Sequence, residues 1–511
     1  MNRNNELTYS SFDLQTLLHG MEGVELYNAD REIRVSGIEY DSRKVEGDSL
    51  FVAVEGMETD GHKFVAGAVE AGASAVMVTV SRFEEFSYLA QKGVGIVTAA
   101  DTRAALSVIS SRFFGDPSHS VPVIGITGTN GKTTITYMLE SILTRAGYNP
   151  GVIGTINYRW SGKTKQAANT TPESRDLHQL MSVMVQDEVN CIIMEVSSHA
   201  LSLKRADDIA FDYAVFTNLT RDHLDYHHDF DEYFDAKMRL FTLLGKSDKK
   251  KKAAFINSDD PYGKRILKDK DGYSYRMYGY GIESETDYAV SAASVQSSIT
   301  GNSFLVLRPF EKEFRLQMAG RFNIYNSLAA IGVTHVMGLP VGAIVDGLSR
   351  LKKVPGRFDA ITSRGGFSVV IDYAHTDDAL DQLLRSVRAL EPARVITVFG
   401  CGGNRDTSKR PLMAAASEAH SDWTIITSDN PRKEDPAKII DDIVNGMSGD
   451  RYEVIENREE AIKHAVHMAE KNDIIVIAGK GHEDYQIIGD KKSHFDDREM
   501  AQKYISAREN V

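Results

Sequence analysis

The stretch Gly125-Ile-Thr-Gly-Thr-Asn-Gly-Lys-Thr-Thr134 carries residue types that bind phosphate. Gly128 and Gly131 would let backbone N–H groups converge on phosphate oxygens. Lys132 would reach the β- and γ-phosphates of a nucleotide, and Thr133 would ligate Mg²⁺. The usual G-x-x-x-x-G-K-[ST] spacing is imperfect, because the first glycine of the stretch lies one residue too early. An ordinary glycine-rich turn is the alternative, but a preceding strand and a following helix favour nucleotide binding.

Further polar clusters follow apolar runs along the chain. Ligands of open α/β sheets bind at the carboxyl ends of strands, so this placement predicts one cleft between two sheets. The clusters are Glu195-Val-Ser-Ser-His199, Asn218 to Tyr226, Asp372-Tyr-Ala-His375, Gly400 to Arg405, Ser428 to Arg432 and Gly479-Lys-Gly-His-Glu483.

Two of these clusters hold candidate metal ligands. Glu195 would direct a carboxylate at nucleotide-bound magnesium, although a solvated strand-end carboxylate is the alternative. His223 and His227 have zinc-like spacing, but without nearby cysteines the metal signal is weak. We interpret His227 and His228 as surface-loop histidines. Lys237 lies in a segment of helical periodicity, where a lysine by default faces solvent.

The last third of the chain is rich in cationic side chains, which are Arg357, Arg405, Lys409, Arg410, Arg432 and Lys480. The planar fork of arginine pairs two carboxylate or phosphate oxygens at once. Asp429-Asn-Pro-Arg432 presents acid, amide and guanidinium together, which suits a zwitterionic ligand such as an amino acid. An Asn-Pro turn with an exposed arginine explains the same residues equally well.

Alternating strand and helix patterns predict the elements that must position these residues. Apolar strands are expected at 49–54, 73–78, 94–97, 121–126, 191–196, 213–217, 253–257, 368–371, 395–399, 423–427 and 474–478. The segment from about 272 to 318 alternates instead, which indicates an antiparallel excursion, and a helix is expected at 323–337. The βαβ rhythm predicts an α/β protein with mostly parallel sheets.

Composition limits the classes of function. The 511 residues carry a net charge of −13, which disfavours general affinity for nucleic acid. Two cysteines, Cys191 and Cys401, are too few for a disulfide framework and fit a reducing compartment. The polar start Met1–Glu6 does not resemble a signal peptide, and no apolar run is long enough to cross a bilayer. We therefore expect a cytoplasmic protein without membrane insertion.

Many separated motifs together resemble the Mur ligases, the ATP-dependent amide-bond-forming enzymes of peptidoglycan synthesis, and most closely their diaminopimelate-adding branch. The motifs are Asp41-Ser-Arg43, Gly128-Thr-Asn-Gly-Lys-Thr133, Asn169-Thr-Thr-Pro172, Glu195-Val-Ser-Ser-His199, Asn218 to His227, Ala236-Lys237, Gly320 to Asn326, Pro355-Gly-Arg-Phe358, Asp372-Tyr-Ala-His-Thr376, Asp429-Asn-Pro-Arg432 and Gly479 to Asp484. They span essentially the whole chain in order.

The resemblance implies three domains. These are a small N-terminal α/β domain for the UDP-sugar (1–116), a central P-loop ATPase-like domain with a mostly parallel sheet (117–350), and a C-terminal Rossmann-like α/β domain for the amino acid (351–511). It also implies that a substrate carboxylate attacks the γ-phosphate of ATP and that an amine then attacks the acyl phosphate. Electrostatic stabilisation would carry the first step.

The resemblance also assigns roles to residues. Lys132, Glu195, His223 and Lys237 would be catalytic, with Thr133 and Glu195 at a first magnesium and His223 and carbamylated Lys237 at a second. The nucleotide would contact Gly128, Thr129, Asn130, Gly131, Lys132, Thr133, Thr134, Asn323, Arg357 and Asp372. The UDP-N-acetylmuramoyl dipeptide would contact Ser42, Thr170, Thr171, Ser197 and Arg205. The amino acid would contact Arg405, Asp429, Asn430, Arg432, Gly479 and Glu483.

Arg432 favours meso-diaminopimelate over lysine, because a buried arginine without the distal carboxylate costs binding energy. Three positions depart from the family pattern: Leu203 replaces a glutamine, Asp377 a proline and Asn404 an aspartate. They would also fit a paralogue with a related UDP-sugar peptide. The alternatives are a lysine-adding enzyme, another amide ligase such as a folylpolyglutamate or cyanophycin synthetase, and an ATP-dependent switch protein. We expect a monomer.

Overall fold

The computed structural model describes residues 11–27, 32–56 and 59–510, so the polar start Met1–Glu6 lies outside the described residues. Two compact units can be distinguished. The first unit contains residues 1–125, 149–212 and 239–252, and the second contains residues 126–148, 213–238 and 253–511. Each unit is built from layers of helix and strand.

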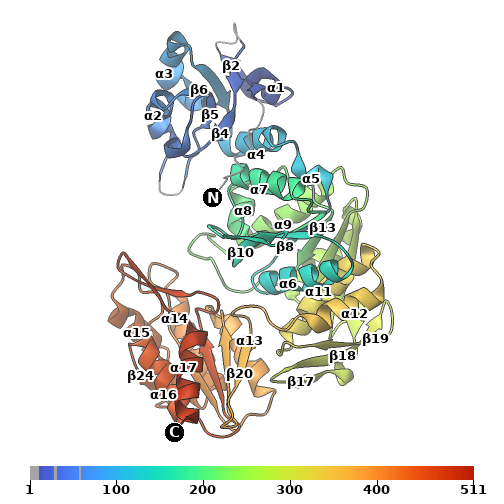
Figure 1. The fold of residues 1–511 in the computed structure, drawn as a ribbon, viewed down its shortest axis with the longest axis vertical. Helices are drawn as coiled ribbons and strands as arrows, with labels where there is room; N and C mark the ends of the chain where they lie inside the picture. The colour runs from blue at the N-terminus through green and yellow to red at the C-terminus, as the bar shows by residue number, and fades with distance from the viewer. Residues whose placement is uncertain (1–10, 28–31, 57–58, 511) are drawn as a thin grey trace. The chain divides into compact units, whose positions relative to one another are not determined.

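A five-stranded sheet forms the N-terminal part of the first unit (Figure 1). Its strand order is β2 (Val24–Tyr27), β7 (Gly95–Ala99), β6 (Ala73–Thr79), β5 (Ser49–Val52) and β4 (Gly37–Glu39), parallel except for β2. Alternate residues of β5 point to opposite faces of the sheet. Leu50 packs with α1 (Leu14–Leu18) and α4 (Thr102–Phe113), whereas Phe51 packs with α2 (Val65–Glu70). This period of two explains why a short apolar run fills both layers.

The rest of the first unit centres on β12 (Cys191–Glu195), which is buried along its whole length. It pairs in parallel with β9 (Pro150–Ile153), and β10 (Asn157–Trp160) and β11 (Lys163–Gln166) continue as antiparallel strands. α7 (Ser174–Gln186) and α8 (Ser198–Ser202) flank the polar residues before and after β12. Cys191 is fully buried, as the sequence predicted.

The chain passes from the first unit to the second within β8 (Val123–Thr127). The phosphate-loop residues follow, and α6 (Lys132–Arg145) begins immediately after Gly131. The predicted strand and helix are thus confirmed with a shift of one or two residues. Ile135, Met138, Leu139 and Ile142 are buried on one face of α6, which is the helical spacing seen in the sequence.

The central part of the second unit has parallel strands β13 (Tyr213–Phe216), β14 (Ala253–Asn257), β15 (Arg276–Gly281) and β16 (Tyr288–Val290). The antiparallel excursion predicted for about 272–318 is confirmed only in its second half, as β17 (Gln296–Ser298), β18 (Gly301–Arg308) and β19 (Lys312–Leu316). It is wrong for the first half, because β15 and β16 pair with each other in parallel. The further helices are α9 (Phe230–Lys246), which ends in the first unit, α10 (Pro261–Lys268), α11 (Phe322–Val336) and α12 (Val341–Arg350). The expected helix at 323–337 is therefore confirmed as α11.

The C-terminal part of the second unit is a six-stranded sheet between two helical layers. Its order is β20 (Asp359–Thr362), β21 (Ser368–Asp372), β25 (Ile474–Ala478), β22 (Val395–Phe399), β23 (Trp423–Ile426) and β24 (Tyr452–Val454), and only β20 is antiparallel. One face packs against α13 (Asp377–Arg388), α14 (Lys409–His420) and α15 (Pro436–Val444), and the other against α16 (Arg458–Met468) and α17 (Asp497–Glu509). A hairpin of β26 (Tyr485–Ile488) and β27 (Lys491–His494) precedes α17.

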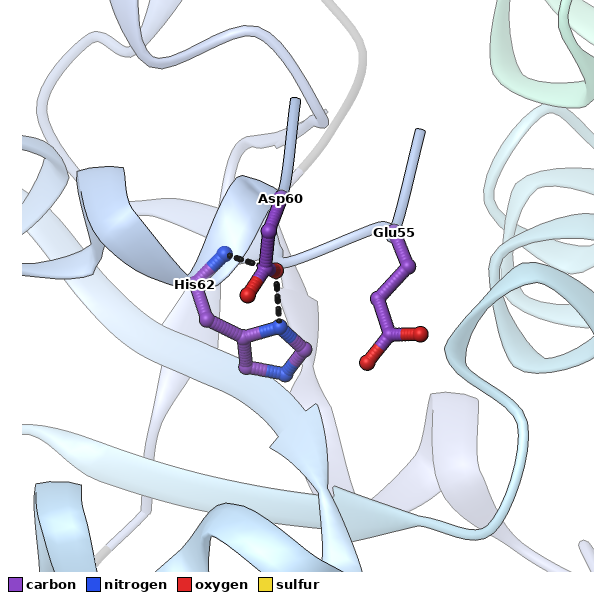
Figure 2. Close-up of side chains that lie close together, drawn as sticks. All are labelled: Glu55, Asp60 and His62. Atoms are coloured by element: carbon purple, nitrogen blue, oxygen red, sulfur yellow. Dashed lines mark hydrogen bonds and ion pairs between the residues drawn. The ribbon is translucent and has the colours of Figure 1, made fainter. Parts of the chain in front are cut away.

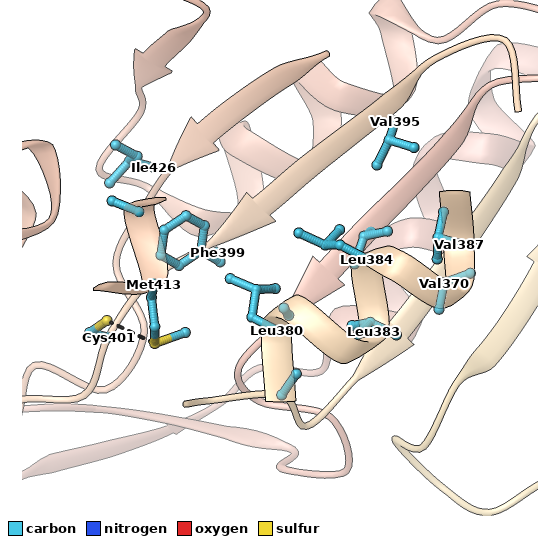
Figure 3. Packing of buried hydrophobic residues seen from close by; sticks show 14 of the residues in the cluster. Val370, Leu380, Leu383, Leu384, Val387, Val395, Phe399, Cys401, Met413 and Ile426 are labelled. Carbon is cyan, nitrogen blue, oxygen red and sulfur yellow. Dashed lines mark hydrogen bonds between the residues drawn. The ribbon is translucent and has the colours of Figure 1, made fainter. Parts of the chain in front are cut away.

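Packing fixes how this sheet meets its helices. Figure 3 shows the leucines of α13 lying over Val370, Val395 and Phe399, with Met413 and Cys401 beside them. Val369 and Ile371, which flank Val370 in β21, pack on the opposite face of the sheet, in the core with α16 and α17. The α/β class with mostly parallel sheets is confirmed. Among the described residues, no helix is long and apolar enough to span a bilayer.

Candidate functional site

The phosphate loop requires glycine at two positions for steric reasons. Gly128 has a φ of 139°, and a Cβ there would lie 1.8 Å from Oγ1 of Thr217. Gly131 has a φ of 92°, and a Cβ would lie 2.4 Å from Oδ1 of Asn326. Both the backbone conformation and the space therefore exclude other residues. The fold therefore explains why the sequence motif has glycine at both positions.

The segment after β13 holds this loop in place. The backbone N–H of Thr129 donates to the carbonyl of Asn218, and the N–H of Asn130 donates to the Asn218 side chain, both at 2.9 Å. Thr217 Oγ1 donates to the Asn130 carbonyl at 2.6 Å. Lys132 Nζ lies 2.8 Å from the carbonyls of Gly128 and Thr129. The loop is thus a rigid cradle at the start of α6, where the helix dipole favours anions.

A cavity of about 600 Å³ opens beside this loop within the second unit. It is lined by the phosphate loop, by residues at and after the ends of β13 and β14, by Tyr280 of β15, by the start of α11, and by Arg357 with the segment from β21 into α13. The lining residues include Asn130, Gly131, Thr134, Thr217, Asn218, Asn257, Asp260, Tyr325, Asn326, Arg357, Asp372, Tyr373 and Asp378. Of the six polar clusters expected to share one cleft, Asn218 to Tyr226 and Asp372 to His375 contribute residues to this cavity, whereas the other four clusters contribute no lining residue.

Arg357 and Arg385 are the arginines of the cavity lining that come from the C-terminal part of the chain, and Arg357 is linked to the phosphate-loop motif by a hydrogen bond. Its Nη2 donates to Thr133 Oγ1 at 3.3 Å, and its guanidinium lies 4.7 Å from the centroid of the Tyr373 ring. Its buried Nε has no hydrogen-bond partner among the described residues. A buried donor without an acceptor is costly, so Arg357 is suited to an anionic ligand in this cavity.

Two other predicted nucleotide contacts take different positions. Asp372 lines the cavity, and its carboxylate accepts from the N–H groups of Phe358 at 2.7 Å and Ala374 at 2.8 Å. Burial raises the pKa of Asp372, although Arg357 and these N–H groups oppose the shift. Asn323 is fully buried and is not among the lining residues. Its Oδ1 instead accepts from Asn326, which does line the cavity.

Lys237 is only 1% exposed, so the default expectation of a solvent-facing lysine is wrong. Tyr233 lies four residues earlier on α9, and the lysine Nζ is 4.2 Å from the centroid of its ring. Burial, together with the charge of Lys132, holds the pKa of Lys237 well below its ordinary value, although Asp222 opposes the shift. A neutral amine at this position is a nucleophile rather than a cation.

The loop before α9 contains three histidines, His223, His227 and His228. His223 has a φ of 56°, and its Nε2 lies 3.3 Å from the Asp222 carboxylate. His227 is fully buried between the rings of Tyr226 and Tyr233, so our interpretation of it as a surface residue is wrong. Tertiary packing of aromatic rings overrode a polar local sequence. His228 is exposed, as expected.

In the first unit, Glu195 is 1% exposed and is not the solvated strand-end carboxylate of the alternative interpretation. Its Oε1 accepts from the N–H of Thr155, and its Oε2 accepts from Thr155 Oγ1, both at 2.9 Å. Thr155 Oγ1 also lies 3.0 Å from Thr170 Oγ1. Oxygen ligands gathered at the end of a strand suit a hard divalent cation.

Three predicted dipeptide contacts, Thr171, Ser197 and Arg205, form a hydrogen-bonded group next to Glu195. Thr171 Oγ1 donates to the Glu195 carbonyl at 2.8 Å, and the N–H of Ser197 donates to Thr171 Oγ1 at 3.2 Å. Arg205 Nη1 donates to the Thr171 carbonyl at 3.3 Å. Ser42 is half-buried in a short 3₁₀ helix next to its N-cap residue Asp41. The triplet at 41–43 is therefore a capped turn.

The predicted amino-acid contacts gather around a buried lysine in the C-terminal sheet. Lys480 is fully buried, and its Nζ lies 3.3 Å from both Asp429 Oδ1 and Asn430 Oδ1 and 3.7 Å from Glu483 Oε2. Asn430 Nδ2 donates to Glu483 Oε2 at 2.8 Å. Gly479, with a φ of 113°, lies against Asp429. Two carboxylates and one amide thus converge at the ends of β23 and β25.

Arg432 and Arg405 lie beside this group on adjacent loops. Arg432 is half-buried rather than buried, and its Nη1 donates to the Gly403 carbonyl at 2.8 Å. The premise that Arg432 is a buried arginine is therefore wrong. Arg405 is exposed on the loop that follows β22. Both guanidinium groups are accessible to a carboxylate ligand.

One further cluster of possible metal ligands was not expected. Among the described residues, Glu55, Asp60 and His62 offer ligand atoms within 4.8 Å of one another. Figure 2 shows that Asp60 is bonded to the backbone N–H and to Nδ1 of His62. His62 Nε2 accepts from the N–H of Thr79 at 3.0 Å, and Asp60 also pairs with Arg82. Since both ring nitrogens are engaged, we assign this cluster a structural role.

Sequence reasoning missed several residues of these groups. Asp222 and Asn326 lie inside motifs that we quoted, but no pattern distinguished them from their neighbours. Tyr233 could have been found, because it precedes Lys237 by one helical turn. Lys480 was noted only as one cation among several.

Family comparisons match three successive segments of the chain. The Mur ligase family, catalytic domain, matches residues 34–114, the Mur ligase middle domain matches 126–334, and the Mur ligase, glutamate ligase domain, matches 356–481. These segments cover the phosphate loop, the lining residues of the cavity and the predicted amino-acid contacts except Glu483.

Individual proteins are similar over nearly the full chain. UDP-N-acetylmuramoyl-L-alanyl-D-glutamate--2,6-diaminopimelate ligase 1 of Clostridium acetobutylicum is 42% identical over 94% of this chain and 97% of its own length. The ligase of the same name, without the numeral, from Geobacter sulfurreducens is 44% identical over 91% and 94%. A solved structure of a 2,6-diaminopimelate ligase is 30% identical, with a TM-score of 0.69, over 98% of this chain and 100% of that one.

Proposed function

Because the chain belongs to the Mur ligase family, we propose that it is an ATP-dependent ligase of peptidoglycan synthesis. It adds meso-diaminopimelate to the D-glutamate of UDP-N-acetylmuramoyl-L-alanyl-D-glutamate and releases ADP and phosphate. The observation that carries this proposal is the identity of 42% and 44% to diaminopimelate ligases over more than nine-tenths of the chain.

The cavity of the second unit supports ATP as the energy source. The phosphate loop and the start of α6 would hold the phosphates, with Lys132 neutralising charge that moves between them. Arg357 would meet the same ligand from the C-terminal part, because its unpartnered Nε needs an acceptor. Asp372 and Thr134 line the same cavity, and Asn323 would act by holding Asn326.

Divalent cations fit the oxygen and nitrogen donors that the motifs provide. Thr133 and Glu195 would hold one Mg²⁺, and both are buried side chains with oxygen donors. His223 and a carbamate on Lys237 would hold a second. Mg²⁺ supplies neutralisation of the phosphate charge when bound. The lowered pKa of Lys237 supports carbamylation, because it favours the uncharged amine and only that form adds carbon dioxide.

The two remaining substrates would be held by the groups described above. Ser42, Thr170, Thr171, Ser197 and Arg205 would contact the UDP-N-acetylmuramoyl dipeptide. Asp429, Asn430, Gly479 and Glu483 would contact the ammonium end of the amino acid. Arg405 and Arg432 would contact its distal carboxylate.

Arg432 supports meso-diaminopimelate over lysine. Its guanidinium is fixed by the Gly403 carbonyl, so one edge stays directed for a carboxylate that lysine does not have. Discrimination by a missing hydrogen-bonding group is strong, because the protein group is then left unpaired. Lysine addition is the second candidate, favoured only by the partial exposure of Arg432.

Phosphate release tests this function directly. The purified protein would be assayed with ATP, Mg²⁺ and the UDP-muramoyl dipeptide, and either meso-diaminopimelate or lysine would be added. We expect release that depends on the dipeptide and on meso-diaminopimelate. Release that ignores both amino acids would contradict the ligase assignment, and release with lysine alone would contradict the role of Arg432.

Three further expectations stay predictions. We propose domain boundaries near residues 116 and 350, a cytoplasmic location without membrane insertion, and a monomer. Limited proteolysis would test the boundaries, and sedimentation velocity would test the monomer.

A further inference from the structure

Arg405 and Arg432 lie on two loops, and these loops are in close contact with each other. The first, residues 400–408, follows β22 and contains Arg405. The second, residues 427–435, follows β23 and contains Arg432. The N–H of Gly403 donates to the Asn430 carbonyl at 2.9 Å, and a Cβ on Gly403 would lie 2.0 Å from the Pro431 carbonyl oxygen. The two backbones are therefore in contact.

An ion pair between a fully buried arginine and a half-buried glutamate lies beneath this contact. Arg410, in the first turn of α14, is fully buried, and its Nη1 and Nη2 donate to the two carboxylate oxygens of Glu434 at 2.8 Å each. Nη1 also donates to Asp442 on α15 at 2.8 Å. Such a two-pronged contact fixes the carboxylate in orientation as well as in position.

Glu434 also binds the first loop, residues 400–408. Its Oε2 accepts from the N–H of Asn404 at 2.9 Å, and Asn404 Oδ1 accepts from the N–H of Lys433 at 3.2 Å. Asn404 has a φ of 53°, so this carboxylate supports a backbone conformation that few residues adopt. Arg405 is the next residue. The pair thus connects one arginine-bearing loop to the other.

We propose that the Arg410–Glu434 pair is a positioning device that sets the spacing of Arg405 and Arg432 for the distal carboxylate of the amino acid. This inference rests on the proposed function, because it assumes a dicarboxylic amino acid at this site. Neither Arg410 nor Glu434 need touch the substrate. Each acts through the loop that it holds, since a recognition group displaced by a fraction of an ångström loses much of its binding.

Glu434→Gln is the main test, because it keeps the shape and removes the charge. We expect KM for meso-diaminopimelate to rise about tenfold, with kcat and KM for ATP changed less than about twofold. Amide hydrogen exchange in residues 402–405 should also become faster. A variant with wild-type KM for the amino acid and unchanged exchange would overturn the proposal.

Asp473→Asn provides a matched control in the same domain. Asp473 is 1% exposed and accepts from Arg394 Nη2 at 2.6 Å, but it precedes β25 at the amino end of the sheet. We expect it to lower Tm without changing KM for meso-diaminopimelate or exchange in residues 402–405. An equal rise of KM in both variants would show that the effect follows from lost stability and would refute the positioning role.

A double variant separates positioning from folding in a second way. Arg410→Met combined with Glu434→Leu replaces this pair by apolar side chains, which often restores stability. We expect the Tm of the double variant to be close to that of the wild type, while its KM for meso-diaminopimelate stays raised as in Glu434→Gln. Recovery of KM together with Tm would contradict the proposal. If the wild-type protein shows no phosphate release that depends on the amino acid, the proposed function is refuted. The comparison of amide hydrogen exchange in residues 402–405 would still decide whether the Arg410–Glu434 pair holds the loop.

Discussion

At the scale of single residues, burial decides which of the polar side chains can do chemistry. Lys237 has lost its contact with water and lies on the ring of Tyr233, and its pKa is lowered by burial first and by Lys132 second. A surface lysine would be a cation at neutral pH and would not add carbon dioxide. The tertiary environment therefore shifts the pKa of this lysine in the direction that the proposed carbamate needs.

Lys237→Ala should lower ligase activity by about 100-fold or more, because the proposed carbamate would be lost. A short carboxylic acid such as acetate should restore part of the activity by supplying an equivalent anion. The measurement is phosphate release with and without the acid. Lys246→Ala, on an exposed position of the same helix, is the control and should behave as wild type. Near-normal activity of Lys237→Ala would remove the carbamate proposal.

The same lysine predicts a pH effect on stability. Its pKa in the folded protein lies below the ordinary value of 10.5, so between these values the unfolded chain binds a proton that the folded protein excludes. Stability from this site therefore rises as pH rises towards 10.5 and is lost as pH falls. Lys237→Met should raise Tm relative to wild type in the absence of bicarbonate and Mg²⁺. Thermal scans between about pH 6.5 and about pH 9 should show this difference shrinking as pH rises; a difference that grows would contradict the sign.

At the scale of elements, strand ends and helix starts determine where ligands are held. The phosphate loop lies between β8 and α6, and the segment after β13 fixes its backbone through Thr217 and Asn218. Asp429 and Gly479 occupy the equivalent places after β23 and β25. In each case a parallel strand delivers the polar residues to one edge of its sheet.

Gly131→Ala should abolish ATP binding, because a Cβ would lie 2.4 Å from Asn326 Oδ1 and the φ of 92° is strained for alanine. Gly147→Ala is a matched control. Gly147 follows the other end of α6 with a φ of 89°, but a Cβ there meets nothing within 4 Å. The control should cost about 1–2 kcal/mol of stability and leave nucleotide affinity unchanged. Calorimetric titration with ATP would show the difference, and equal affinity in both variants would argue against a crowded phosphate loop.

At the scale of the whole molecule, the nucleotide cavity combines residues that are far apart in the chain. Asn130 and Gly131 come from the phosphate loop, whereas Arg357, Asp372 and Tyr373 come more than 200 positions later. Asn130 Nδ2 also lies 3.4 Å from Asp378 Oδ2 at the start of α13. Nucleotide binding should therefore affect both the central and the C-terminal part of the second unit.

Hydrogen–deuterium exchange with ADP and Mg²⁺ tests this expectation. We expect slower exchange both in residues 128–134 and in residues 357–375, because one ligand would contact both stretches. Arg357→Ala should weaken protection in both stretches and lower affinity for ADP about tenfold or more, since it removes a charge-assisted contact. Protection confined to the phosphate loop would contradict a shared site.

Local pattern in the sequence determined much of this protein. Apolar runs gave the strands β8, β12, β21 and β25 within a few residues, because the side-chain periods of strands and helices are written in consecutive residues. The phosphate loop was recognisable for the same reason, since its glycines and Lys132 act within one short turn. The position of polar clusters after strands also predicted the cavity.

Only the tertiary structure decided which side chains are buried and which of them meet. His227 and Lys237 have polar neighbours in sequence, yet both are buried because Tyr233 and its surroundings enclose them. Arg432 is less buried than expected, and the pair of Arg410 with Glu434 joins residues from different elements. Periodicity is a local property, whereas burial and charge pairing depend on contacts between distant segments, and these contacts control the pKa of Lys237 and the placement of Arg432.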